Sequence, residues 1–215
     1  MTIRKVLLVL FLALASTTLF SQTAKEKEQI KRKRLRTIDL YHINVGLDAH
    51  FNQNLFFSPK ASFGIGSFRH ILNADVGIRY TLGGSAFFGK EEYVMVHQLP
   101  IFISAQCNFV SWETGCVFIG AEIAYHIPIT GLHYVPSTST LKFDNQLNQA
   151  HFSGRAKAGA RINQWEIGLF YEYDLAPMMD QKHVYESPEY DYDILHDYLF
   201  ERIRYGISLG YNFIL

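Results

Sequence analysis

Large apolar side chains alternate with small or polar ones through most of this chain. At the carboxyl end, a large set alternates with a small or polar set: Tyr205, Ile207, Leu209, Tyr211 and Phe213 against Arg204, Gly206, Ser208, Gly210 and Asn212. The same period of two recurs in residues 41–51, 74–82, 117–127 and 165–175. Successive side chains of a strand point to opposite faces, whereas a helix would spread these apolar residues around its circumference. The alternation therefore predicts strands with one apolar and one polar face.

The remaining segments complete a set of eight predicted strands. Weaker alternation marks residues 60–69, 93–106 and 151–162, although Pro100 argues against a central position in a sheet. Residues 202–213 supply the last strand.

The connections between these strands alternate in length. Those at 70–73, 107–116 and 163–164 are mostly short, whereas those at 52–59, 83–92, 128–150 and 176–201 are longer and polar. Short turns at one end and long loops at the other are typical of membrane barrels. We therefore expect an all-β fold, an eight-stranded antiparallel up-and-down transmembrane β-barrel, with both chain ends on the short-turn, periplasmic side.

The apolar face of this barrel is expected to contact lipid. A soluble barrel with an apolar interior is the alternative, but the polar face here is rich in glycine, for example Gly46, Gly77 and Gly168. Small residues suit a crowded interior better than a water-facing surface. The clear strands also reach the roughly 9–11 residues that a tilted membrane strand needs, and aromatic residues gather near the ends of the apolar rows, as in the girdles of membrane barrels.

The first residues have the three-part plan of a secretory signal peptide. Arg4 and Lys5 precede an apolar run over 6–15, and small and polar residues follow as far as Ser21. The run is too short for a membrane-spanning helix. We expect residues 1–21 to be removed, 22–37 to form a basic periplasmic segment, and 38–215 to form the barrel. The formal net charge of +0 gives no indication of nucleic acid binding.

Two short segments resemble known outer-membrane barrels. The ending GYNF resembles the terminal strand that the outer-membrane assembly machinery reads, although Ile214 and Leu215 follow the aromatic residue here. The segment HQLPIFIS resembles the proline-containing central strand of small porin-family, PorT-like barrels, and the overall size is similar to the OmpA/OmpX type. The resemblance covers residues 38–215. It implies the outer membrane of a Gram-negative-type envelope, with lipid and the barrel assembly machinery as partners, and implies no activity.

A barrel of eight strands leaves room inside only for side chains. The predicted inward set holds six acidic and five basic residues: Asp48, Asp75, Glu122, Glu166, Glu172 and Asp174, with Arg79, Arg155, Lys157, Arg161 and Arg204. Because buried charges are costly unless paired, we expect ion pairs. Asn163-Gln164 is typical of a two-residue hairpin turn, which would place Arg161 opposite Glu166 and Arg155 opposite Glu172.

Three apolar residues also fall at alternate positions whose side chains are expected to point inward. Phe102, Phe118 and Phe170 either fill the lumen or line a small hydrophobic pocket. Cys107 is expected to point outward and Cys116 inward, so a direct disulfide between them would require a bulge. Their pairing stays open.

Motifs for catalysis or for metal binding are absent from the sequence. It contains no H-E-x-x-H, C-x-x-C or G-x-S-x-G, and we expect no cofactor and no metal. The loop over 178–201 is acidic and rich in tyrosine, which is typical either of a solvated rim or of a contact surface; a calcium site is a weaker alternative. Its candidate contact residues, toward an extracellular or envelope protein, are Tyr185, Tyr190, Tyr192, Asp191, Asp193 and Asp197.

Together these patterns predict a non-enzymatic envelope barrel. Its role would be structural, in surface contact, or as an accessory to envelope secretion or assembly. One alternative is an outer-membrane enzyme acting on lipid acyl chains, which needs a hydroxyl beside a histidine near the outer rim; the candidates there are His126, His133, Ser137 and Ser153. The other alternative is a carrier of a small hydrophobic ligand, using the inward phenylalanines.

Overall fold

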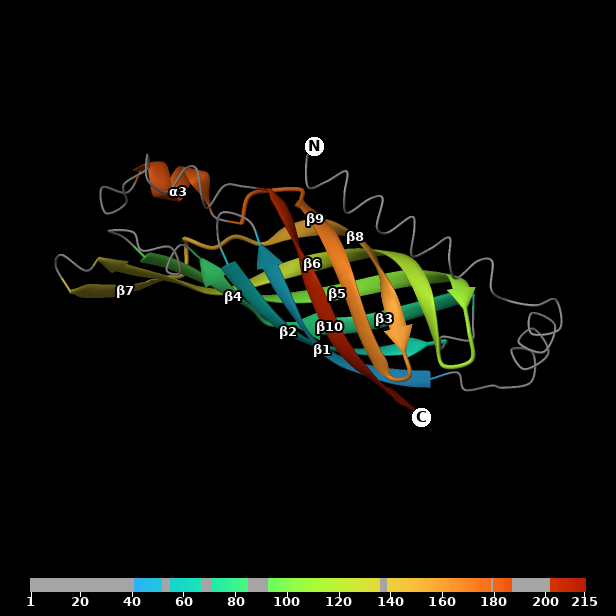
Figure 1. The fold of residues 1–215 in the computed structure, drawn as a ribbon. Coiled ribbons are helices and arrows are strands. Elements are labelled where there is room, and N and C mark those ends of the chain that lie inside the picture. The colour runs from blue at the N-terminus through green and yellow to red at the C-terminus, as the bar shows by residue number, and fades with distance from the viewer. Residues whose placement is uncertain are drawn as a thin grey trace, which may run out of the picture.

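The computed structural model describes residues 41–51, 55–66, 71–84, 93–135, 139–178, 180–186 and 202–215. The signal peptide expected at 1–21 and the basic segment expected at 22–37 lie outside these residues. The described residues form a sheet that closes on itself as a barrel (Figure 1). Within them, no helix is both long and apolar enough to cross a membrane.

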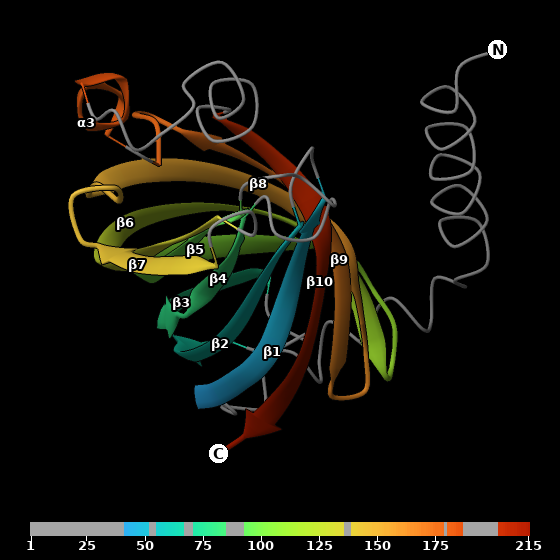
Figure 2. The ribbon, with the colours of Figure 1, turned by 90° about the vertical axis from the view of Figure 1, so that its left-hand side faces the viewer.

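Ten strands and one short helix follow each other along the described chain. They are β1 (Tyr41–Phe51), β2 (Leu55–Ile65), β3 (Leu72–Arg79), β4 (Thr81–Gly84), β5 (Tyr93–Ser111), β6 (Gly115–Val135), β7 (Thr140–Asp144), β8 (His151–Ile162), β9 (Trp165–Asp174), α3 (Gln181–Glu186) and β10 (Ile203–Ile214). β3 and β4 both pair with β2 and β5, so together they count as one strand of the barrel, and β7 pairs only with β6 and is not part of the closed sheet. The described part of the barrel therefore has eight strands, which we call its staves. Each pairs antiparallel with the next, and β10 closes onto β1 (Figure 2). The predicted fold class is confirmed.

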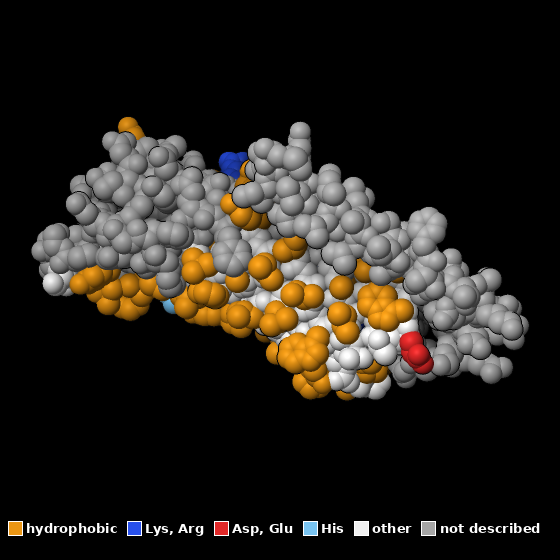
Figure 3. All heavy atoms as spheres, in the orientation of Figure 1, with side chains coloured by type: hydrophobic (Ala, Val, Ile, Leu, Met, Phe, Trp, Pro, Cys, Tyr) orange, Lys and Arg blue, Asp and Glu red, His pale blue; other side chains and the backbone are white. Residues whose placement is uncertain are grey.

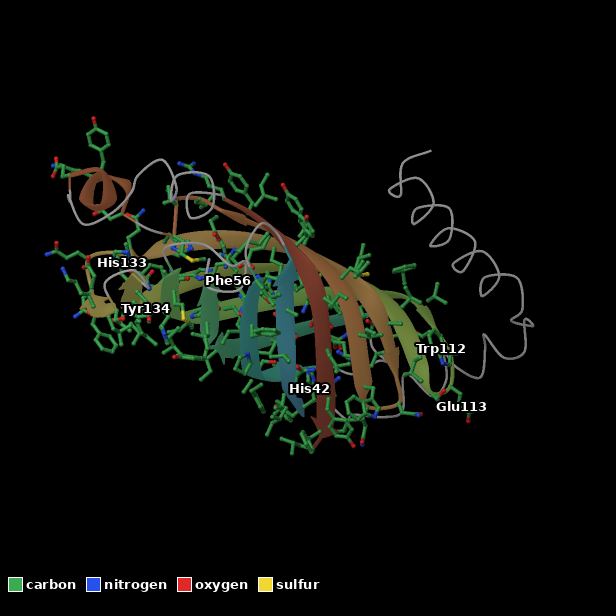
Figure 4. All side chains as sticks on the ribbon, turned by 60° about the vertical axis from the view of Figure 1, so that its left-hand side comes forward. His42, Phe56, Trp112, Glu113, His133 and Tyr134 are labelled. Carbon is green, nitrogen blue, oxygen red and sulfur yellow. The ribbon has the colours of Figure 1, made fainter. Side chains whose placement is uncertain are left out.

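The two ends of the barrel differ as expected. The backbone N–H of Leu215 donates to the carbonyl oxygen of Tyr41 at 3.0 Å, so β1 begins where β10 ends. The β5–β6 turn, which contains Trp112 and Glu113, lies at this end as well, whereas β7 and α3 lie at the opposite end (Figures 1 and 4). We call these the turn end and the loop end.

Several predicted strand limits were wrong. β2 begins at Leu55 and ends at Ile65, so residues 55–59 belong to a strand and not to a loop. The alternation is masked there because Phe56 points inward, with 5% of its surface exposed, and Pro59 interrupts the pattern. β5 and β6 also run farther than predicted, so the expected connections at 107–116 and 128–150 consist largely of strand.

Two prolines lie beside one interruption in the sheet. The pairing of β5 with its neighbour breaks between Ile78 and Thr81, opposite Pro100, which has no N–H to donate. On the other side of the break, the N–H of Tyr80 donates to the carbonyl oxygen of Pro59 at 2.9 Å. The interruption lets β5 keep Pro100 in a strand that is paired on both sides, which the sequence argument had disfavoured.

The outer surface of the staves is apolar from one end to the other. Ile123 on β6 is 67% exposed and Leu169 on β9 is 58% exposed, and hydrophobic side chains are spread over the face of the barrel that Figure 3 shows. Aromatic contacts mark both ends. Tyr41–Phe63, Trp165–Tyr211 and Tyr211–Phe213 lie toward the turn end, and Tyr125–Phe152 and Tyr80–His97 lie toward the loop end. An apolar band between two aromatic rows is the exterior of a membrane barrel.

Glycine on the inner face allows the lumen to be packed closely. A Cβ at Gly206 would lie 2.7 Å from Cζ of Phe170 and would collide with the backbone of β1. The glycines of the alternating pattern therefore leave space for the larger groups that cross the barrel.

Candidate functional site

The β8–β9 hairpin has the register that its turn predicts. Asn163 adopts a positive φ of 55°, as two-residue hairpin turns require. Arg161 lies opposite Glu166, with a 2.6 Å salt bridge, and Arg155 lies opposite Glu172, with a 2.7 Å salt bridge. All four side chains are buried, and the hairpin places their charges inside the barrel.

Arg155 is the centre of a buried charge network. Its guanidinium contacts Asp48 on β1, Glu172 on β9 and, at 3.6 Å, Glu122 on β6. Arg79 on β3 bonds Glu122 at 2.5 Å and approaches Asp48 at 3.5 Å. We call these five residues the central cluster. It ties together five strands around the barrel, so charged side chains occupy the axis along which a channel would run.

A sixth base balances the interior. Lys60 on β2 bonds Asp48 at 2.7 Å and Ser208 at 2.6 Å. Lys60 is missing from the predicted inward set because the second strand was expected to begin at this residue. Among the described residues, the six inward acids are thus matched by six inward bases. A neutral, paired lumen explains how so many charges remain buried at tolerable cost.

Two of the three inward phenylalanines pack against cations. The ring of Phe102 lies 5.0 Å from Cζ of Arg79, and the ring of Phe170 lies 4.1 Å from Cζ of Arg155. Phe118 is 1% exposed and sits where a Cβ at Gly159 would touch it. A cavity of about 20 Å³ touches Phe102 but is otherwise lined by polar residues, and it suits a water molecule better than an apolar ligand.

Histidines do meet hydroxyl groups inside the barrel. His126 Nε2 lies 2.9 Å from Ser153 Oγ, which donates to Glu172 Oε1 at 2.7 Å. Both residues are 1% exposed and face the lumen, away from the lipid. His133 is also buried but lies near β7 at the loop end (Figure 4), and Ser137 lies outside the described residues.

The candidate contact loop is described only in part. Tyr185, on α3, is 72% exposed at the loop end, whereas Tyr190, Asp191, Tyr192, Asp193 and Asp197 lie outside the described residues. Cys107 and Cys116 are both described. They pair with Ile119 and Ser111 respectively, and no disulfide joins the two cysteines.

Comparison with known proteins identifies the architecture. No protein-family model matches the chain, and no curated protein matches it in sequence. Among solved structures, Neisserial surface protein A (NspA) matches with a TM-score of 0.50 and 13% identity, covering 82% of this chain and 97% of that one. The N-terminal β-barrel domain of Pseudomonas aeruginosa OprF and Ail, the attachment invasion locus protein of Yersinia pestis, each match with a TM-score of 0.39 and 12% identity. They cover 81% and 80% of this chain and 98% and 97% of their own.

Proposed function

We propose that this chain, which has the fold of a small eight-stranded outer-membrane β-barrel such as NspA, resides in the outer membrane as a non-enzymatic barrel with a packed lumen. Its role there is structural or in surface contact, including contact within an envelope secretion or assembly complex. The observation that carries the proposal is the combination of an apolar exterior with a closed, ion-paired interior. Such a molecule is held by lipid on the outside and offers only its two ends to other molecules.

The loop end offers the larger surface for contact. β6 and β7 form a hairpin that projects beyond the barrel (Figure 1), and Leu141 and Phe143 on β7 are 54% and 70% exposed. Tyr185 adds a further exposed ring at the same end. Exposed aromatic and aliphatic side chains are typical of protein contact surfaces, which supports an extracellular or envelope protein as partner.

The two alternative functions have weaker support. The His126–Ser153 pair has the geometry that an acyl-chain enzyme needs, but it faces the lumen and is closed off from the lipid face. A carrier would need an apolar cavity, and the inward phenylalanines support guanidinium groups.

Cell fractionation tests the location directly. We expect the protein in the outer-membrane fraction, with faster migration on gels before boiling than after it, because a closed barrel resists detergent until heated. A boiled sample supplies the unfolded reference. Recovery of folded protein in the soluble fraction would contradict the proposal.

The packed lumen predicts that the barrel conducts no solutes. Liposomes containing the folded protein should swell in an iso-osmotic sugar solution no faster than empty liposomes, because the central cluster fills the axis. Liposomes containing a large, water-filled porin serve as the positive control. Swelling well above that of empty liposomes would show that the lumen opens and would overturn the packed-lumen assignment.

A further inference from the structure

Three potential metal-binding side chains meet near the loop end of the lumen. His126 on β6 and His151 at the start of β8 are paired across the sheet, with stacked rings whose centroids are 4.3 Å apart. Asp174, at the end of β9, completes the group, and one donor atom from each residue lies within 4.8 Å of the others. All three residues are at most 3% exposed. The charge network described above does not account for the two histidines.

A chain of hydrogen bonds fixes the proton on His126. Asn148 Nδ2 donates to the backbone oxygen of His97 at 2.8 Å, so Asn148 Oδ1 accepts from Gln98 Nε2 at 2.7 Å. The remaining Gln98 Oε1 therefore accepts from His126 Nδ1–H at 3.1 Å. A neutral His126 then carries its lone pair on Nε2, which lies 2.9 Å from Ser153 Oγ, so a bound ion would replace this hydrogen bond.

His151 is oriented in the same way. Its Nδ1–H donates to the backbone oxygen of Gln149 at 3.1 Å, which leaves the lone pair on Nε2. That Nε2 atom has no hydrogen-bond partner among the described residues and lies 3.5 Å from Asp174 Oδ1. Asp174 Oδ2 likewise has none among them. Buried polar atoms without partners are destabilising, and these two would be satisfied together by a cation.

We propose that His126 Nε2, His151 Nε2 and Asp174 Oδ2 bind one divalent transition-metal ion of the zinc type. Two imidazoles and a carboxylate form a recognised ligand set for zinc. The carbonyl oxygens that accept from both Nδ1–H groups are the outer-shell partners that metal-binding histidines use.

Two carboxylates and one guanidinium surround the three donor atoms. Arg204 bonds Asp174 through Oδ1, which holds the carboxylate in place and leaves Oδ2 available. Glu172 lies 3.5 Å from His126 Nε2 and adds a second negative charge. The bound ion would link β6, β8 and β9 where the loops begin, and so brace the rim from which the β6–β7 hairpin projects.

Zinc titration of the tag-free, folded, chelator-stripped protein tests this site. In competition with a chromophoric chelator, the wild-type protein should bind one equivalent of Zn²⁺. Co²⁺ in its place should give the visible absorption of a site of low coordination number. Failure of the folded wild-type protein to bind one equivalent would overturn the proposal and would assign His151 and Asp174 to a shared proton.

Two variants locate the binding. His151→Ala should weaken Zn²⁺ binding by roughly tenfold or more, because it removes a ligand. His133→Ala, which alters a buried histidine of the same strand as His126 but outside the group, should bind as the wild type does. Heat-dependent gel migration checks that each variant folds, and His151→Gln replaces His151→Ala if the latter does not. Equal affinity of the His151 variant and the wild type would refute the site.

Discussion

Replacement of Arg155 by methionine is expected to lower the free energy of unfolding by about 3–5 kcal/mol, the usual cost of breaking a buried ion pair from one side. Methionine keeps much of the apolar length of the side chain but removes the positive charge. Asp48, Glu122 and Glu172 would then share Arg79 as the remaining base of the central cluster. Because Asp48 and Glu172 are fully buried, water cannot compensate for the lost guanidinium.

Urea unfolding of the folded protein in lipid vesicles, followed by the fluorescence of Trp112 and Trp165, measures this change. Arg202→Met is the matched control, because Arg202 is an exposed arginine just before β10 whose loss should alter stability by no more than about 0.5 kcal/mol. The double variant Arg155→Met with Glu172→Gln should cost less than the sum of the single changes, since removing both charges leaves neither of them unpaired. A loss at Arg155 no larger than that at Arg202 would mean that the central cluster does not hold the barrel together.

The alternation of apolar and polar residues was sufficient to predict the strands in which it is strict. Residues 41–51 form a strand with those limits, and the strand predicted at 165–175 ends one residue earlier, because each has an uninterrupted apolar row on one face. The turn at Asn163 then set the register, since a two-residue loop leaves one way to pair the flanking residues. The contacts of Arg155 and Arg161 within their hairpin therefore follow from local sequence alone.

The contacts across the lumen were not predictable in this way. Asp48 and Arg155 are 107 positions apart, and only the closure of the sheet brings them together. The His126, His151 and Asp174 group needs no such closure, because β6, β8 and β9 are neighbours in the sheet, but it depends on where one strand starts and the next ends. No spacing in the chain marks it. Lys60 was missed for a different reason, because inward Phe56 and the proline at position 59 hid the first half of β2.

Replacement of Leu169 by arginine is expected to cost about 2–4 kcal/mol, the range for a charge at the middle of a membrane barrel's lipid face. Leu169 lies on β9 between Trp165 at the turn end and Tyr173 at the loop end, and it points outward with 58% of its surface exposed. An arginine there must place its guanidinium in hydrocarbon or bend it toward the headgroups. Because the side chain points away from the lumen, the change in unfolding free energy shows whether lipid or water surrounds the barrel.

The same change at the membrane edge supplies the control. Ile162→Arg, on the outward face beside the Asn163 turn, should cost only about 0–1 kcal/mol, because headgroups and water reach it. The two unfolding free energies, measured in the same vesicles, should differ by at least roughly 1 kcal/mol if Leu169 is at mid-membrane depth. A barrel whose exterior faces water would tolerate both arginines equally, within about 0.5 kcal/mol. That result would require a partner other than lipid to cover the apolar exterior.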